Sequence, residues 1–111
     1  MAQVFNNADT ETNASNLAVT SGAGETTVLD KIPCSGARYA AVTIIANSGS
    51  ISACALYGSP DGVKYMPVSG FSSFAVSSPN MGHAEVTAMF QYLRVTTTGV
   101  ANLDVYLLAV Q

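Results

Sequence analysis

A chain of 111 residues suffices for one domain that buries roughly two thirds of the surface its unfolded form exposes. Hydrophobic residues make up 49% of the sequence and charged residues only 10%, well below the roughly 25% of ordinary soluble domains. The net charge is −3, and the four cationic residues are scattered along the chain, at Lys31, Arg38, Lys64 and Arg94. Such a chain has no continuous basic surface for a phosphate backbone, so we expect no nucleic-acid partner.

The first 15 residues form a polar leader. Residues 6–15 are rich in Asn, Thr, Ala and acidic side chains without a clear period, which predicts an extended N-terminal arm over residues 1–15 and a folded domain over residues 16–111. The start of the chain lacks the basic segment and apolar core of a secretory signal, and the longest apolar run, residues 39–46, is far shorter than a membrane span. We therefore expect synthesis in the cytoplasm and no membrane partner.

Strand-forming segments recur through the rest of the chain, separated by breaks rich in Gly, Ser, Pro and Asn. No segment shows a convincing helical period. Such spacing is typical of a two-sheet β protein, so we predict an all-β fold, a jelly-roll-like antiparallel β-sandwich with an extended N-terminal arm. The strands are predicted near residues 17–20, 26–32, 38–46, 51–57, 63–68, 71–76, 85–88, 90–97 and 101–110.

The central strand over residues 38–46 is apolar on both faces. Ala40, Val42 and Ile44 alternate on one face, and Ala41 and Ile45 lie on the other. Because the outer face of a sandwich sheet meets solvent, a second apolar face predicts a cover. The outer apolar face is covered either by another protein, which is a neighbouring subunit or a larger partner, or by the N-terminal arm or a loop of the same chain. The sequence leaves both alternatives open.

Two hairpins are predicted from turn chemistry and register. Ser59-Pro60-Asp61-Gly62 separates two strand-forming runs, and we expect a positive φ at Gly62. Near the C-terminus, pairing residues whose numbers sum to 198 sets Leu93 opposite Val105 and Arg94 opposite Asp104, with a loop over residues 98–100. The Arg94–Asp104 pair would then fix the register of the two strands and not form a functional site.

Candidates for chemistry are few. His83 is the single histidine and has no second ligand at metal spacing, so we predict a surface-loop residue. Cys34 and Cys54 match no metal spacing and are predicted to be reduced apolar fillers, with a disulfide between them as the alternative. A Cys54–His83 nucleophile pair lacks a recognisable setting. We therefore predict no catalytic, cofactor-binding or metal-binding residue and no cofactor.

Several segments resemble known β-sandwich proteins. Leu56-Tyr57-Gly58-Ser59-Pro60-Asp61-Gly62-Val63-Lys64-Tyr65 resembles the S-x-D-G-x-x-W/Y hairpin of discoidin-like carbohydrate binders and short phage virion proteins. Tyr92-Leu93-Arg94-Val95 and Leu103-Asp104-Val105-Tyr106 resemble the closing hairpin of the same group. The whole chain, rich in small residues and poor in charge, is similar to capsid decoration (cement or staple) proteins of tailed phages, such as those of the epsilon15-like phages. The resemblance implies a jelly-roll virion subunit that binds the outer surface of the shell, with the major capsid protein as its partner, and stabilises it.

Three classes of function follow from these features. A capsid decoration protein accounts for the low charge, small size and β architecture together, and we expect it to form a homo-oligomer, either a dimer or a trimer. The alternative is a carbohydrate-binding β-sandwich module, with Tyr57, Tyr65 and Tyr92 as candidate platforms, or a phage tail or baseplate component. An enzyme needs clustered titratable groups, whereas the acidic residues here are dispersed, so we expect no enzyme.

Overall fold

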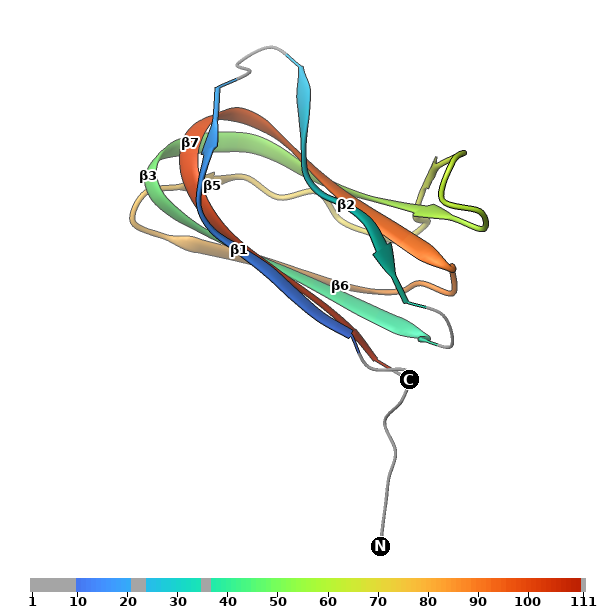
Figure 1. Cartoon of the computed structure of the whole chain (residues 1–111). Helices are drawn as coiled ribbons and strands as arrows, with labels where there is room; N and C mark the ends of the chain where they lie inside the picture. The colour runs from blue at the N-terminus through green and yellow to red at the C-terminus, as the bar shows by residue number, and fades with distance from the viewer. Residues whose placement is uncertain (1–9, 21–23, 35–36, 111) are drawn as a thin grey trace, which may run out of the picture.

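The computed structural model describes residues 10–20, 24–34 and 37–110, and these residues form strands and no helix (Figure 1). Every strand pairing is antiparallel. No helix in these ranges has the length and apolar character that crossing a membrane requires. The strands are β1 (Thr10–Val19), β2 (Glu25–Pro33), β3 (Tyr39–Ser59), β4 (Met66–Pro67), β5 (Val76–Ser77), β6 (Met81–Thr87) and β7 (Tyr92–Val110).

Two long strands, β3 and β7, organise the fold. They pair along their whole lengths, from Tyr39 opposite Val110 to Ser59 opposite Tyr92, and they bend together at one end of the molecule (Figure 1). The register shifts between Ala46 and Ser48 and again between Ile51 and Ala53, and β-bulges of this kind sharpen the bend of a sheet.

Glycines make this bend possible. Gly49 has a φ of 73° and Gly99 a φ of 145°, conformations that other residues rarely adopt. A Cβ atom at Gly49 would collide with the carbonyl oxygen of Val100, and one at Gly99 would lie 2.5 Å from the carbonyl oxygen of Ser50. The two strands therefore approach each other so closely at the bend that neither position has room for a side chain.

The bend divides a single sheet into two layers that face each other. The first layer contains β1, the second half of β7, the first half of β3, and β6. The second layer contains β2, the first half of β7, the second half of β3, and β4, while β5 pairs with β3 at the bend. The buried apolar side chains of both layers form one core, whose largest members are Ile44, Ile51, Leu56, Leu93, Leu103 and Leu107. The predicted all-β antiparallel sandwich is confirmed.

The C-terminal hairpin prediction was wrong, because residues 92–97 and 101–110 belong to one continuous strand, β7. Leu93 pairs with Gly58 and Val105 pairs with Ile44, both on β3. Gly99, read as the hairpin loop, lies opposite Ile51 within the bend. The predicted alternation of faces was right, since Leu93 and Val105 are both fully buried. In the same way, the segments predicted as strands 38–46 and 51–57 are the two halves of β3.

The Ser59–Gly62 turn is confirmed. The Ser59 hydroxyl oxygen accepts hydrogen bonds from the backbone N–H groups of Asp61 (3.2 Å) and Gly62 (2.8 Å), and Gly62 has a φ of 78°. The Asp61 carboxylate accepts the backbone N–H groups of Val63 and Lys64, which together lower its pKa. The returning strand is shorter than predicted, because only Met66–Pro67 pairs with β3. The strand predicted at residues 71–76 is likewise shorter, because only Val76–Ser77 forms a strand, β5.

The boundary predicted after residue 15 falls inside strand β1. Thr10 pairs with Ala109 and Ala14 with Val105, so residues 10–15 are part of the first layer and not of an arm. The polar composition misled the prediction because an edge strand is held by backbone hydrogen bonds to its neighbour and needs few apolar side chains. The remainder of the predicted arm, residues 1–9, lies outside the described residues.

Candidate functional site

The first layer carries an apolar surface on the side away from the core. We define the apolar outer face by the residues Tyr39, Ala41, Ile45, Met81, Tyr106, Leu108 and Val110, which come from β3, β6 and β7. Cross-strand pairing places them side by side, with Tyr39 opposite Val110, Ala41 opposite Leu108 and Ile45 opposite Met81. Tyr39 is 52% exposed and Met81 is 64% exposed. Both faces of the first half of β3 are therefore apolar, as predicted, and much of the outer one meets solvent.

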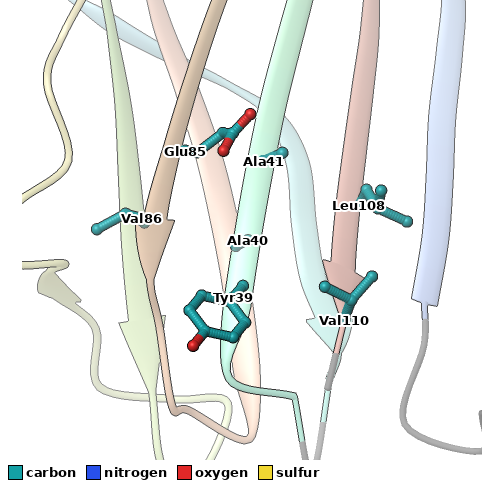
Figure 2. Close-up of a pocket in the computed structure, with 7 residues that line it drawn as sticks. All are labelled: Tyr39, Ala40, Ala41, Glu85, Val86, Leu108 and Val110. Carbon is teal, nitrogen blue, oxygen red and sulfur yellow. The ribbon is translucent and has the colours of Figure 1, made fainter.

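A shallow hollow of about 320 Å³ lies at one end of the apolar outer face. Figure 2 shows Glu85 and Val86 on β6 at one side, Leu108 and Val110 on β7 at the other, and Tyr39, Ala40 and Ala41 on β3 between them. Glu85 contributes the single charged side chain of this lining. The hollow suits an apolar side chain of a protein partner better than a polar small molecule, because few groups could orient a polar ligand.

His83 lies on the same side of the first layer, on strand β6 and not in the predicted surface loop. Its Nδ1 atom is 2.7 Å from the hydroxyl of Thr43, and its Nε2 atom is 2.8 Å from a carboxylate oxygen of Glu85. The side chain is exposed, as the sequence indicated. Cys54 is buried in the core, so the structure does not bring a Cys54–His83 pair together.

The second layer has a polar recess of about 280 Å³ on its outer side. Its centre is the Glu25 carboxylate, which accepts hydrogen bonds from the Tyr57 hydroxyl (2.8 and 3.0 Å) and the Thr96 hydroxyl (3.1 Å). The hydrogen bond to Glu25, with burial and the carboxylate charge, raises the pKa of Tyr57. The recess is lined by Glu25, Thr27, Tyr57, Tyr65, Arg94 and Thr96.

Cations lie over two of the three tyrosines that could serve as sugar platforms, Tyr65 and Tyr92. The guanidinium carbon of Arg94 lies 3.8 Å from the ring centroid of Tyr65, and the Lys31 ammonium lies 5.8 Å from that of Tyr92. Arg94 also donates a hydrogen bond of 2.8 Å to Asp30 on β2, and not to the predicted partner Asp104. Tyr57, Tyr65 and Tyr92 do gather on one side of the second layer, but these contacts compete with stacking on a sugar ring.

Both cysteines are buried free thiols, so the predicted reduced state is the one observed. Burial raises the pKa of Cys34 to about 11 and that of Cys54 to about 12. The Cys34 thiol donates a hydrogen bond to the carbonyl oxygen of Phe90. Raised pKa values suppress the thiolate form, which is the reactive one. Across the described ranges, no group of three or more His, Cys, Asp and Glu side chains is placed to hold a metal ion.

The polar recess could not be predicted from the sequence, because its members come from β2, β3, β7 and the loop before β4. Glu25 and Asp30 on β2 meet Tyr57 and Arg94 only through the pairing of β2 with β7 and of β7 with β3. The only local signal was a pair of acidic residues in an otherwise weakly charged strand. By contrast, the apolar outer face was visible from the double alternation in residues 38–46.

No protein-family model matches the sequence, and no curated protein matches it either. Among solved structures, a chain of the Bacillus endospore appendages, a family of disulfide-linked pili, is similar with a TM-score of 0.49 and 13% identity, over 99% of this chain and 94% of that one. PirA is similar with a TM-score of 0.43 and 13% identity, over 95% of this chain and 94% of that one. At this level of likeness, neither structure carries an argument about function.

Proposed function

We propose that this chain is a structural protein of a phage virion, a capsid decoration protein that binds the outer surface of the shell and stabilises it. The observation that carries the proposal is the apolar outer face, which leaves large side chains such as Tyr39 and Met81 exposed on one side of a regular sheet. Exposed apolar surface of this kind marks interaction sites on proteins. The low charge of the chain further indicates that its affinity comes from apolar burial and shape, and not from ion pairs.

The surface suits a protein partner better than a soluble ligand. Its hollow is shallow and lined mainly by apolar residues of β3, β6 and β7, and a protruding apolar side chain of another protein would fill it. The major capsid protein is the partner that this proposal assigns. A tail or baseplate protein would use the same face, and binding to tail structures instead of shells would distinguish that alternative.

Carbohydrate binding is the less favoured function. The polar recess supports it by gathering Tyr57, Tyr65 and Glu25 around one cavity. However, Glu25 already accepts hydrogen bonds from the hydroxyls of Tyr57 and Thr96, and Arg94 covers the ring of Tyr65. A sugar would have to displace these contacts before it could bind.

The test is co-sedimentation of the purified chain with empty shells assembled from the major capsid protein encoded in the same genome. Binding should persist between low salt and about 1 M salt, because screening weakens mainly exposed ionic contacts. Leu108→Glu places a charge in the apolar outer face and should abolish binding. Val63→Glu is the matched control, because Val63 is 74% exposed in the Ser59–Tyr65 loop, outside that face, and should leave binding unchanged.

Failure to bind shells at either salt concentration would refute the decoration function. Equal binding by the wild type and Leu108→Glu would show that a different surface is used. Circular dichroism melts of both variants should overlay that of the wild type, since each substitution is at an exposed position.

A further inference from the structure

Five strands, β1, β2, β4, β5 and β6, pair with one neighbour only, and they differ in how well they are protected from pairing with another chain. Strand β1 shifts register between Ala14 and Leu17, and Asn16 there has a φ of 53°. Strand β2 shifts register twice and carries Lys31 with a φ of 50°. Strands β4 and β5 have only two residues each. Bulges, lysines and short length are the features that prevent edge-to-edge pairing.

Strand β6 has none of these features. It pairs seven consecutive residues with β3, from Thr87 opposite Tyr39 to Met81 opposite Ile45, without a register shift. Its sequence, MGHAEVT, contains no lysine and no proline. Within the described parts of the chain, β6 is the one long and regular edge strand.

The free backbone groups of β6 can be identified from the hydrogen bonds at its two ends. The Ala88 N–H donates to the Arg38 carbonyl (2.8 Å), and the Asn80 carbonyl accepts from the Ala46 N–H (3.1 Å). Residues with even numbers therefore direct their backbone groups toward β3. Because these directions alternate along an antiparallel strand, the N–H and C=O groups of Met81, His83, Glu85 and Thr87 face away from β3. No strand in the described ranges pairs with that side.

We propose that two copies of this chain associate by antiparallel pairing of their β6 strands, about a two-fold axis that passes beside Ala84. In this register Met81 lies opposite Thr87 of the second copy, and His83 lies opposite Glu85 of the second copy. Each such pair exchanges two backbone hydrogen bonds, so the outward groups of both strands are satisfied by about eight bonds. The interface is isologous, as a two-fold dimer requires.

Charge complementarity selects this register. An axis at Glu85 would set two carboxylates directly opposite each other, which destabilises a strand pair. An axis at His83 would oppose two imidazoles and leave each Glu85 opposite Met81. An axis at Ala84 instead sets a carboxylate opposite an imidazole twice. On the core side, the same register sets Gly82 opposite Val86 and Ala84 opposite Ala84, so small residues allow the strands to approach.

The dimer would join two first layers into one continuous sheet. The apolar outer faces of the two copies would then be adjacent, with Met81, which is highly exposed in the single chain, at the new boundary. The inference is independent of the proposed shell binding, because it concerns the edge of β6 and not the face of the layer. A dimer without shell binding, or shell binding by a monomer, would separate the two.

Sedimentation velocity of the full chain over about 1–500 µM tests the association, with dissociation constants in this range expected for a short strand interface. Glu85→Pro removes an outward N–H and adds a ring where the second copy would lie, but leaves the hydrogen bonds to β3 intact. Glu85→Ala is its matched control, because it removes the same carboxylate and keeps the N–H. We expect Glu85→Pro to be monomeric and Glu85→Ala to dimerise with a modestly raised Kd.

The register is tested separately. His83→Glu sets two carboxylates opposite each other at both pairs and should raise the Kd about 2- to 30-fold, while adding Glu85→Lys should restore it. Ala84→Cys should form an intermolecular disulfide under a mild oxidant, because the two Ala84 Cα atoms would lie about 4.5 Å apart. Thr87→Cys should not, because the two copies of that residue would lie roughly 20 Å apart along the strand.

A wild-type chain that stays monomeric at the highest concentration, or sediments as a trimer, would overturn the proposal. So would a dimer that survives Glu85→Pro, provided that its thermal melt shows the variant is folded. A dimer that is lost in Glu85→Pro, but whose Ala84→Cys and Thr87→Cys variants cross-link to the same extent, would overturn the register.

Discussion

Replacing Gly49 by alanine should destabilise the protein more than any other exposed glycine substitution of the same size, because the backbone itself fills the space beside it. The φ of 73° at Gly49 alone costs an alanine about 1–2 kcal/mol. In addition, the new Cβ would overlap the carbonyl oxygen of Val100 and lie 2.9 Å from the Cα atom of Ala101. These are main-chain atoms of a paired strand, so they cannot rotate away.

Gly70→Ala is the matched control for this substitution. Gly70 has a φ of 89°, so it carries a similar conformational cost, but the nearest atom to its Cβ would be a Val86 methyl at an ordinary 3.5 Å. The difference between the two variants therefore isolates the overlap at the bend. Overpacking of this kind costs about 1–3 kcal/mol, so Gly49→Ala should lose roughly 2–5 kcal/mol in total and Gly70→Ala about 1–2 kcal/mol.

Urea unfolding measures both values, and a thermal melt should place Gly49→Ala at least about 4 °C below Gly70→Ala, since each kcal/mol shifts the Tm of such a domain by about 4–8 °C. Equal midpoints for the two variants would mean that the long strands can separate at the bend without loss. In that case the close approach of β3 and β7 would not hold the two layers together.

Three further outcomes are expected. Gly62→Val should cost about 1–2 kcal/mol in urea unfolding through its φ of 78°, and a variant as stable as the wild type would contradict the turn geometry. Stability should fall as pH rises above about 9, because the Cys54 thiol ionises near its ordinary pKa of 9.0 in the unfolded chain, whereas its pKa in the folded protein is about 12. Below about pH 9 the thiol is protonated in both states, so it adds no pH dependence. Cys54→Ala should reduce the slope of unfolding free energy against pH above about 9. A double-mutant cycle with Asp30→Asn and Arg94→Gln should give only about 0.2–1 kcal/mol, reduced by salt, because both side chains are partly exposed; a larger, salt-independent value would contradict this.

Local chemistry predicted the parts of the fold that depend on neighbouring residues. The turn at Ser59–Gly62 was predictable because its hydrogen bonds join residues at most three positions apart. The buried alternation of Leu93, Val95, Leu103 and Val105 was predictable because side chains of a strand point alternately to its two faces. The apolar outer face followed from the same alternation in residues 38–46.

Long-range pairing could not be deduced in the same way. A glycine between two strand-forming runs predicts a turn, but Gly99 instead allows one strand to pass close to another, and only the position of Ile51 on β3 distinguishes these cases. Likewise, Arg94 has an acidic partner at Asp30 that no pattern within β7 indicates. The polar recess depends on both pairings and was therefore missed as a whole.

The sharing of β3 and β7 by both layers has a consequence for how the chain folds. The pairing of Ser59 with Tyr92 closes a segment of 33 residues, whereas that of Tyr39 with Val110 closes one of 71. Because shorter loops lose less entropy on closure, the two strands should begin to pair in the second layer and proceed around the bend into the first. The two longest strands, β3 and β7, run through both layers, so partial unfolding of one layer should propagate to the other. Backbone amides in both halves of β7 should then exchange with solvent at the same slow rate, as a single cooperative unit.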